Sequence, residues 1–412
     1  MSDALAVAPA TSAPELRTER WALTSAEQAG IIRDLRFRYF KWDAFTGGVC
    51  RVVPETMVLS RSTHEEIVRI VETLSRALER FERRVGSEGE TLRRLGIPGA
   101  LDPLMGGEDD ETLQIARYDL FLTEEGRWMV SEFNEDAPGG FNETAGLPEL
   151  LGDLGGGLTW EGDLCRHLLA ALRPYDSIAL LYATAYAEDL QHMLILERWL
   201  EAAGHRTVLA SPEHLRAGLG RPRVLGTPID AAFRFFPGEW MPRLPNIRTW
   251  LKVAARLPVM NPLRRLVRQS KSMFALWREE AFLDPEDRRL VDEHCPWTES
   301  FDPDKVPMLV EERERWVLKG AFGRMGDSVV IGTLVTEKEW SESLARAALS
   351  PRDFCVQERF AVRPLAFEQG ALYPTVGAYV VNGRFAGYYS RAAARPLITH
   401  EAYHVATAVA ST

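Results

Sequence analysis

The stretch Ile115–Glu143, IARYDLFLTEEGRWMVSEFNEDAPGGFNE, combines strand-forming residues with several carboxylates. Its two halves, Ile115–Thr123 and Arg127–Phe133, are both rich in β-branched and aromatic residues, and Glu125-Gly126 lies between them. This pattern predicts a β-hairpin with a short two-residue turn. We therefore expect two antiparallel strands here.

A two-residue turn determines which side chains face each other across the hairpin. If the residues that flank the turn pair with each other, Asp119 lies opposite Glu132 and Arg117 lies opposite Asn134. Their Cβ atoms should then be about 5 Å apart on one face of the sheet. Two carboxylates and an amide oxygen converge on that face.

Carboxylates that face each other repel, and burial makes the repulsion costlier, so a cation is expected between them. Oxygen ligands of this kind suit Mg²⁺, which keeps several waters and binds one or two protein carboxylates together with substrate phosphates. The alternative is a solvated polar face on which Arg117 neutralises the acids. Because the strands are otherwise apolar and Pro138-Gly139-Gly140 follows closely, we favour a magnesium site.

Composition limits the classes of function. With 412 residues, 46% hydrophobic and 26% charged, the chain is long enough for two or three domains of an ordinary globular protein. A net charge of -10 argues against nucleic acid as the main partner. No apolar run reaches membrane-spanning length and the start lacks the order of a signal peptide, so we expect a cytoplasmic protein with no membrane partner.

The four cysteines are isolated and show no zinc-ligand spacing, so disulfides and structural zinc are not expected. We interpret each of them as a small buried hydrophobic residue. The four are Cys50, Cys165, Cys295 and Cys355.

The N-terminal third contains a tail and two predicted helices. Residues 1–18 are rich in Ala, Pro and Ser and are expected to be disordered. A capping box at Thr24–Glu27 predicts a helix through Arg38, and Ser60–Val85 has apolar residues at helical spacing. A nearby aromatic cluster is expected to belong to the core rather than to a ligand site; it comprises Phe37, Tyr39, Phe40, Trp42 and Phe45.

The middle third has the alternation of a small parallel α/β domain. The glycine-rich residues 151–162 are interpreted as a linker into the helix Asp163–Leu172. A strand at 177–186, a helix at 188–203 and a strand at 206–210 then form a βαβ unit, and 224–236 adds strand material. Arg234 lies at a strand end, where it can bind a ligand or pair with a neighbouring acid.

Two further helices are predicted at Ile247–Arg256 and Leu263–Glu280. The second contains Lys271, which by itself is interpreted as a solvated surface lysine. Trp316–Lys319 reads as a strand that ends in a lysine, before a loop punctuated by glycines. Such a lysine and loop can hold nucleotide phosphates, although an ordinary glycine hairpin fits the loop equally well.

The last part of the chain is predicted to be mostly strand. Residues 354–358 form a strand whose polar end can contact an adenine edge, and an Asn-Gly turn joins Tyr373–Val381 to Arg384–Ser390. Arg391 then ends the hairpin and is either a phosphate clamp or a surface arginine. His400 and His404 are interpreted as ordinary helix residues rather than zinc ligands.

The order of these motifs resembles the glutathionylspermidine synthase family of circularly permuted ATP-grasp ligases. The resemblance extends from about Lys41 to the C-terminus. In that family the carboxylate-bearing strands precede the lysine-bearing strands, as they do here. The motifs are RYD, EFN thirteen residues after the Asp, PGG with Glu143, VLKGAFGRMGDSVVIG, VQERF and GYYSRAA.

The resemblance implies an α/β (α+β) fold, a permuted ATP-grasp domain with a Rossmann-like pre-ATP-grasp subdomain. We expect the first part of the ATP-grasp domain at 19–160, with the metal-binding hairpin. The pre-ATP-grasp subdomain should lie at 161–260 and the nucleotide-binding part at 261–412. The N-terminal cysteine amidase domain of bifunctional members is expected to be missing.

The resemblance also implies roles for individual residues. Asp119, Glu132 and Asn134 would hold Mg²⁺, Arg117 would support the transferred phosphoryl group, and Arg391 would lie near the same phosphate. ATP would be bound by a second set: Lys271, Lys319, Gly323, Gly326, Gln357 and Glu358. Where the family favours a serine or threonine after the metal ligands, this chain has Ala137-Pro138-Gly139-Gly140.

The implied reaction is an ATP- and Mg²⁺-dependent ligation that joins a small-molecule or peptide carboxylate to an amine through an acyl phosphate. Two alternatives remain open. A kinase-like phosphotransferase would leave a stable phosphorylated product, and a nucleotide-binding scaffold would have no turnover. The substrates and the oligomeric state are not encoded in transferable motifs.

Overall fold

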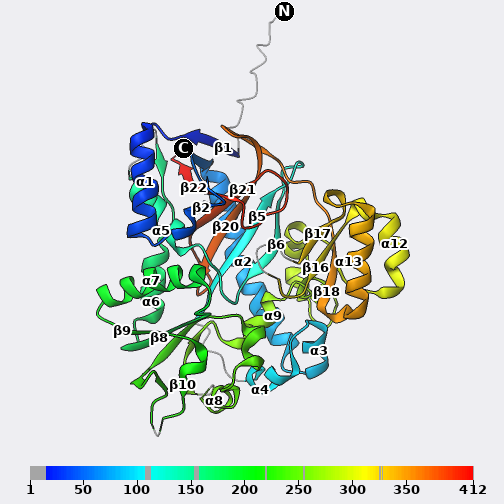
Figure 1. Cartoon of the computed structure of the whole chain (residues 1–412). Coiled ribbons are helices and arrows are strands. Elements are labelled where there is room, and N and C mark those ends of the chain that lie inside the picture. Colours follow the sequence, from blue (N-terminus) through cyan, green and yellow to red (C-terminus); the bar gives the residue numbers. More distant parts are fainter. Residues whose placement is uncertain are drawn as a thin grey trace, which may run out of the picture.

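The computed structural model describes residues 15–106, 113–152, 157–218, 220–253, 256–323, 326 and 328–411. Three larger sheets organise these residues: a nine-stranded sheet at the centre, a four-stranded parallel sheet and a four-stranded antiparallel sheet (Figure 1). Within the described ranges, no helix has the length and apolar character needed to cross a membrane.

The nine-stranded sheet brings together the two ends of the chain. Neighbouring strands in it are antiparallel except for β4 and β22, which are parallel. In spatial order they are β1 (Leu16–Arg20), β4 (Val52–Leu59), β22 (Tyr403–Ala410), β21 (Arg384–Ala393), β20 (Gly370–Val381), β5 (Ile115–Leu122) and β6 (Trp128–Asn134), with β7 (Leu158–Thr159) beside β22 and β19 (Leu365–Phe367) beside β20.

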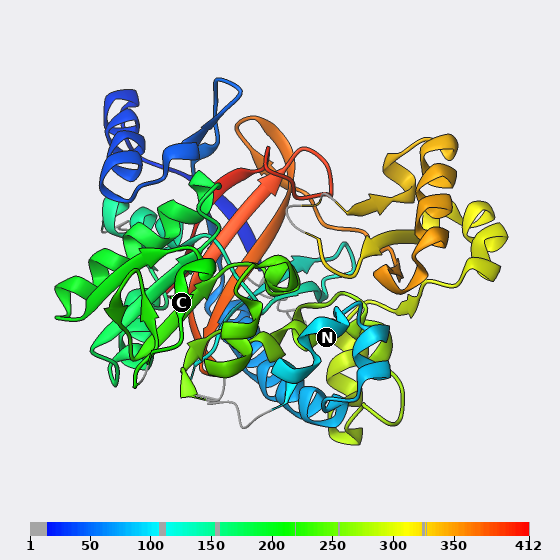
Figure 2. The same cartoon turned by 60° about the horizontal axis from the view of Figure 1, so that its bottom comes forward.

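Alternating side chains bury both faces of this sheet. In β20, Ala378 and Val380 belong to the core that includes helix α2 (Arg61–Val85), whereas Tyr379 and Val381 belong to the core that includes α5 (Phe141–Leu151). This period of two is what a strand covered on both sides requires. Figure 2 shows α2 lying beneath the long C-terminal strands.

The parallel sheet forms a separate layer with the order β14-β13-β8-β9. Its strands are β14 (Val259–Met260), β13 (Ala231–Phe235), β8 (Ser177–Tyr182) and β9 (Arg206–Ala210), with helix α7 (Ala187–Ala202) crossing between β8 and β9. The predicted βαβ unit is therefore confirmed. Arg234 at the end of β13 is buried and pairs with Asp136 at 2.6 Å, so the interpretation as an internal ion pair holds.

The small antiparallel sheet stands apart at the right of Figure 1. Its order is β15 (Thr298–Ser300), β18 (Phe354–Glu358), β16 (Trp316–Gly320) and β17 (Val329–Ile331). Helices α12 (Val306–Glu311) and α13 (Glu337–Leu349) cover one side of it around a core of its own.

The remaining elements are short or peripheral. The helices are α1 (Ser25–Arg38), α3 (Gly89–Arg94), α4 (Asp102–Met105), α6 (Leu164–Leu172), α8 (Ile247–Val253), α9 (Leu266–Gln269), α10 (Met273–Leu276) and α11 (Arg288–His294), and the strands are β2 (Phe45–Thr46), β3 (Val49–Cys50), β10 (Leu215–Arg216), β11 (Arg223–Val224) and β12 (Thr227–Pro228). The capping box at Thr24 and the Ser60 cap are both present, which confirms the first two predicted helices.

The hairpin β5-β6 has the predicted pairs but not the predicted turn. The loop has three residues, because the N–H of Thr123 bonds to the carbonyl of Arg127, and Gly126 adopts a φ of +82°. Three-residue loops commonly end in such a left-handed residue. A bulge at Ser131 then shifts the register back by one residue, so that Asp119 does face Glu132.

The predicted helix Leu263–Glu280 is wrong. Helix α9 ends at Gln269, Ser270 is extended, and α10 begins only at Met273. The break is stabilised from outside: the Ser270 hydroxyl donates to the carbonyl of Leu95 at 2.7 Å, and the N–H of Lys271 donates to the carbonyl of Ala321 at 2.8 Å. Lys271 is consequently buried rather than solvated.

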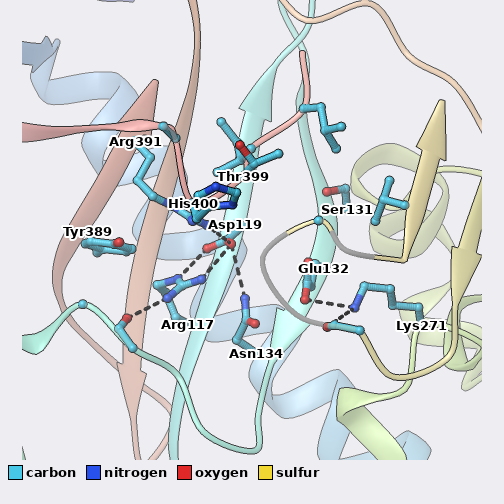
Figure 3. Close-up of a pocket in the computed structure, with 18 of the residues that line it drawn as sticks. Arg117, Asp119, Ser131, Glu132, Asn134, Lys271, Tyr389, Arg391, Thr399 and His400 are labelled. Atoms are coloured by element: carbon cyan, nitrogen blue, oxygen red, sulfur yellow. Dashed lines mark hydrogen bonds and ion pairs between the residues drawn. The ribbon is translucent and has the colours of Figure 1, made fainter. Parts of the chain in front are cut away.

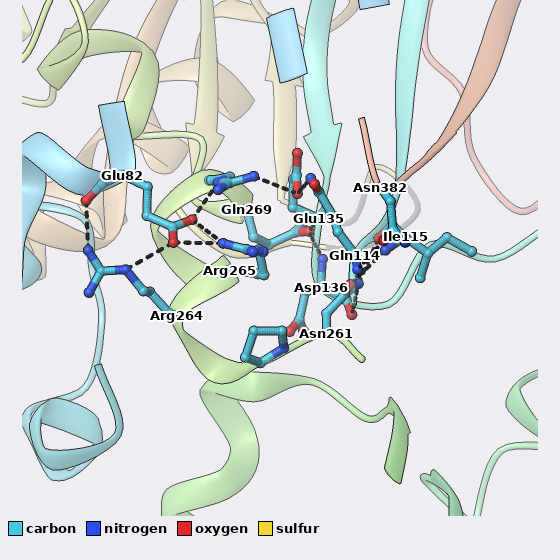
Figure 4. Close-up of polar contacts among 12 residues, drawn as sticks. Glu82, Gln114, Ile115, Glu135, Asp136, Asn261, Arg264, Arg265, Gln269 and Asn382 are labelled. Carbon is cyan, nitrogen blue, oxygen red and sulfur yellow. Dashed lines mark hydrogen bonds and ion pairs between the residues drawn. The ribbon is translucent and has the colours of Figure 1, made fainter. Parts of the chain in front are cut away.

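A buried polar network anchors the segment that precedes Lys271 (Figure 4). Glu82 of α2 accepts hydrogen bonds from Arg264 at 2.9 Å and Arg265 at 2.7 Å. The side-chain carbonyl of Gln269 accepts from the N–H groups of Glu135 and Asp136, at 2.8 and 3.0 Å. These contacts tie the segment Arg264–Gln269 both to α2 and to the end of β6.

Several smaller predictions need correction. Strand β1 begins at Leu16, inside the segment assigned to the disordered tail, whose residues 1–14 lie outside the described ranges. His404 lies in strand β22, not in a helix. The linker 151–162 contains β7, with 153–156 outside the described part, and residues 254–255 of the predicted helix 247–256 lie outside it as well.

The aromatic cluster is only partly buried, contrary to prediction. Tyr39 is buried, but Phe37, Trp42 and Phe45 are exposed. The four cysteines are free. Cys295 and Cys355 are buried as predicted, whereas Cys50 and Cys165 are only partly buried.

Candidate functional site

Every residue predicted for the site lines a single cavity of about 480 Å³. The cavity lies where the nine-stranded sheet, the small antiparallel sheet and the loop that follows β21 meet. The residues are Arg117, Asp119, Glu132, Asn134, Lys271, Lys319, Gly323, Gly326, Gln357, Glu358 and Arg391. Residues distant in sequence are thus brought together, as Figure 3 shows for the centre of the cavity.

An arginine–carboxylate pair lies at the centre of the cavity. Arg117 and Asp119 are two apart on β5 and point to the same side, and Nε and Nη2 of Arg117 donate to the two oxygens of Asp119 at 2.7 and 2.9 Å. Both side chains are buried. Burial alone would raise the pKa of Asp119, but the paired guanidinium outweighs it and lowers that pKa below its usual value.

The Pro138-Gly139-Gly140 turn holds the arginine in place. Nη1 of Arg117 donates to the carbonyl of Gly139 at 2.6 Å, and the guanidinium lies 4.9 Å from the centre of the Tyr389 ring. Gly140 has a φ of +108°, and a Cβ there would lie 2.6 Å from that ring. A side chain at position 140 would therefore be strained and would clash with Tyr389, which favours glycine there.

Two further groups surround Asp119 (Figure 3). The amide Nδ2 of Asn134 donates to Asp119 at 3.3 Å, and Nη2 of Arg391 lies 3.7 Å from the same carboxylate. Asn134 thus presents its amide nitrogen, not its oxygen, to Asp119. For the oxygen to serve as a metal ligand beside Asp119, the amide would have to rotate.

Two buried lysines approach the neighbouring residues Ser131 and Glu132 from the other side of the cavity. Nζ of Lys271 lies 3.1 Å from Glu132 and donates to the carbonyl of Gly323 at 3.1 Å. Nζ of Lys319 donates to the carbonyl of Ser131, the bulge residue, at 3.0 Å. Burial lowers the pKa of Lys319 to about 8, with Glu132 opposing and Lys271 reinforcing the shift.

Asp119 and Glu132 form a donor set that fits Mg²⁺. Their strands pair so that the two carboxylates face each other on one wall of the cavity, and Glu132 is partly accessible. Each is now held by a cation, Asp119 by Arg117 and Glu132 by Lys271. Among the described residues, no group of three or more His, Cys, Asp or Glu is arranged to hold a metal, so phosphates and waters would have to complete the coordination.

The predicted nucleotide residues differ in how they face the cavity. The Nε2 group of Gln357 donates to Thr298 within the small sheet at 3.0 Å, so this amide nitrogen is not free for an adenine. Glu358 points toward Arg315, 3.3 Å away, on the exposed side. Of the glycine loop, Gly323 and Gly326 are described, whereas Arg324, Met325 and Asp327 lie outside the described residues.

One end of the cavity contains charged residues that the prediction of site residues omitted. Lys41 lies 2.6 Å from Glu143 and 2.9 Å from Asp43, and Nδ1 of His404 lies 3.1 Å from Glu143. His192 also lines this end, and its Nε2 accepts from the N–H of Gly140 at 2.6 Å. Only Glu143 had a signal in the sequence, as part of a family motif.

Three solved structures illustrate what this chain is similar to. Among solved structures, a glutathione synthetase-like effector (GSS30) from Globodera pallida in its apo form aligns with a TM-score of 0.62 and 10% identity, over 93% of this chain and 97% of the other. A protein assigned as a gamma-glutamylcysteine synthetase from Methylobacillus flagellatus KT aligns with a TM-score of 0.49 and 13% identity, over 82% and 85%. The ATP-grasp ligase PsnB, with Mg and ADP, aligns with a TM-score of 0.31 and 16% identity, over 57% and 88%.

A comparison with curated protein sequences finds no match. The model of one protein family, glutathionylspermidine synthase preATP-grasp, matches residues 37–410, nearly the whole chain. The predicted α/β ATP-grasp class is thereby confirmed. Because this match covers nearly the whole chain, the protein belongs to the glutathionylspermidine synthase pre-ATP-grasp family, whose broad class is that of the ATP-grasp carboxylate–amine ligases.

Proposed function

We propose that this protein is an ATP-dependent ligase that joins the carboxylate of an amino acid or peptide to an amine through an acyl phosphate. The observation that carries the proposal is the single cavity in which two buried lysines, two arginines and two facing carboxylates meet. Phosphoryl transfer needs this combination, because its catalysis is mostly positioning and electrostatic stabilisation.

In the proposed first step, a substrate carboxylate oxygen attacks the γ-phosphorus of ATP and ADP leaves. Lys271 and Lys319 would neutralise the phosphates from the side of the small sheet. Arg117 and Arg391, which both approach Asp119, would hold the transferred phosphoryl group from the side of the large sheet. Arg117 suits this role because its hydrogen bonds to Asp119 and to the carbonyl of Gly139 hold the guanidinium in one orientation.

Asp119 and Glu132 would hold Mg²⁺, with Asn134 as a further ligand if its amide turns. When bound there, Mg²⁺ would neutralise charge that develops on the phosphates. In the second step the amine nitrogen attacks the acyl carbon, the carbon–oxygen bond to phosphate breaks and an amide forms. The described cavity would shelter the acyl phosphate from water, which otherwise hydrolyses it.

The experiment is ADP release from the purified protein with Mg-ATP across amino acids, short peptides and polyamines, with mass spectrometry of the products. ADP formed only when a carboxylate and an amine are both present, with a product of their combined mass less water, would support the ligase. A stable phosphorylated product without an amide would indicate a phosphotransferase. Binding of Mg-ATP without turnover for any pair would favour the scaffold.

Two variants make the test specific to the cavity. Glu132→Gln removes a proposed metal ligand and the partner of Lys271, so turnover should fall by at least about 100-fold. Glu342→Gln, on the exposed side of α13, is the matched control and should behave as wild type. Undiminished turnover in Glu132→Gln would refute the metal assignment.

A further inference from the structure

The end of the cavity that contains Glu143 and His404 is not used by the steps above. His404 on β22 is paired in register with Arg391 on β21, so the two side chains share one face of the sheet. Because Arg391 approaches Asp119, the imidazole lies beside the point where the phosphoryl group would be transferred. Both residues line the same cavity.

The partners of His404 determine its tautomer. Nδ1 lies 3.1 Å from Oε1 of Glu143 and 3.4 Å from the hydroxyl of Tyr389. Burial raises the pKa of Glu143, but the nearby ammonium of Lys41 lowers it by more, to about 2. The Glu143 side chain is therefore a carboxylate. With Nδ1 this close to a carboxylate, a neutral imidazole is expected to carry its proton on Nδ1, which leaves the lone pair on the other ring nitrogen, Nε2.

The surroundings keep the ring neutral. Burial and the nearby Lys41 lower the pKa of His404 to about 4. Within the described part of the chain, Nε2 has no hydrogen-bond partner. The charged or titratable groups around the ring are Lys41 and Asp43 from the segment before β2, Glu143 from α5, His192 from α7, and Tyr389 and Arg391 from β21.

We infer that Nε2 of His404 is the base that takes the proton from the amine in the second step, with Glu143 as the residue that orients it. This inference rests on the proposed function. A neutral amine nitrogen bonds to the acyl carbon and becomes acidic as it does so. One N–H proton passes to Nε2, the carbon–oxygen bond breaks, and phosphate leaves with the electron pair. The imidazolium, stabilised by Glu143, then returns its proton to phosphate or water.

The test separates this step from acyl phosphate formation. Hydroxylamine reacts with acyl phosphates without a catalyst, so hydroxamate formation reports the first step alone. Wild type, His404→Asn and the control His167→Asn are compared with the carboxylate and amine that give the most ADP in the panel, and with hydroxylamine in place of the amine. His404→Asn keeps a donor toward Glu143 but lacks the base.

We expect His404→Asn to form the amide at least about 100-fold more slowly, which is the usual contribution of a general base, and to form hydroxamate as wild type does. His167→Asn should match wild type in both. An equal loss of amide and hydroxamate in His404→Asn would overturn the inference, because a merely structural role lowers both. If wild type forms no hydroxamate with any carboxylate, the proposed function itself fails and the inference falls with it.

A second measurement does not depend on the turnover of any variant. NMR of ¹⁵N-histidine-labelled wild type, with the His404 signal assigned from its loss in His404→Asn, reports which ring nitrogen carries the proton. At neutral pH we expect a neutral ring with the proton on Nδ1. A proton on Nε2 would contradict the inference whatever the activity of the variant.

Discussion

Replacing Lys319 with methionine should stabilise the protein while it weakens ATP binding. The Lys319 ammonium is buried, and its pKa is lowered from 10.5 to about 8, chiefly by burial. At about 1.4 kcal/mol for each pKa unit, holding this charge in the folded state costs on the order of 3 kcal/mol. Methionine has a similar length and carries no charge.

One contact reduces the gain. The Lys319 ammonium donates to the carbonyl of Ser131, and losing that hydrogen bond costs about 1 kcal/mol. Lys319→Met should therefore raise the free energy of unfolding by about 2 kcal/mol near neutral pH. Functional sites often contain a buried charge that lowers the stability of the free protein, because the function requires that charge.

The dependence on pH identifies the cause. A basic group whose folded pKa is depressed costs stability in full below the folded pKa, here about 8. Between pH 8 and pH 10.5 the folded protein already holds Lys319 without its proton, whereas the unfolded chain still holds the proton. The unfolded chain therefore binds more protons in this range, and the cost disappears as the pH rises toward 10.5. The advantage of Lys319→Met should consequently shrink to near zero by about pH 9.5.

The assay is urea unfolding without nucleotide, followed by circular dichroism, at neutral pH and again at alkaline pH. Lys338→Met on the exposed surface of α13 is the control and should change the unfolding free energy by less than about 0.5 kcal/mol. A Lys319→Met variant that is less stable than wild type, or one whose advantage is independent of pH, would refute the reasoning.

Three further outcomes follow from the site. The Kd for ATP, measured by calorimetry, should rise about tenfold between pH 7 and pH 9, because Lys319 must be reprotonated on binding. The Kd of Lys319→Arg should not change over this pH range. Arg117→Lys cannot make both bonds to Asp119, so kcat should fall by about 100-fold in a coupled ADP assay; a change below threefold would contradict its role. Gly140→Ala should lose roughly 2 kcal/mol of stability in thermal unfolding because its Cβ meets Tyr389, and an unchanged Tm would show that the turn can move.

Local signals predicted most of the secondary structure. The capping box at Thr24 and the helical spacing of apolar residues in Ser60–Val85 depend on neighbours in the sequence, and both helices appear in the structure as predicted. The opposition of Asp119 and Glu132 was predicted too, although a loop one residue longer and a bulge at Ser131 compensate each other. Neither the loop nor the bulge has a unique local signature.

The sequence by itself determined the order of the motifs, and with it the family and the residues that could form the site. Tertiary structure decided which of those side chains are buried and what they face. Lys271 left the surface because contacts with residues 95 and 321 interrupt its helix. His404 became a candidate base only because β22 pairs with β21 and α5 brings Glu143 beside it. Burial and charge at these positions come from partners far away in the chain, and no local pattern records such partners.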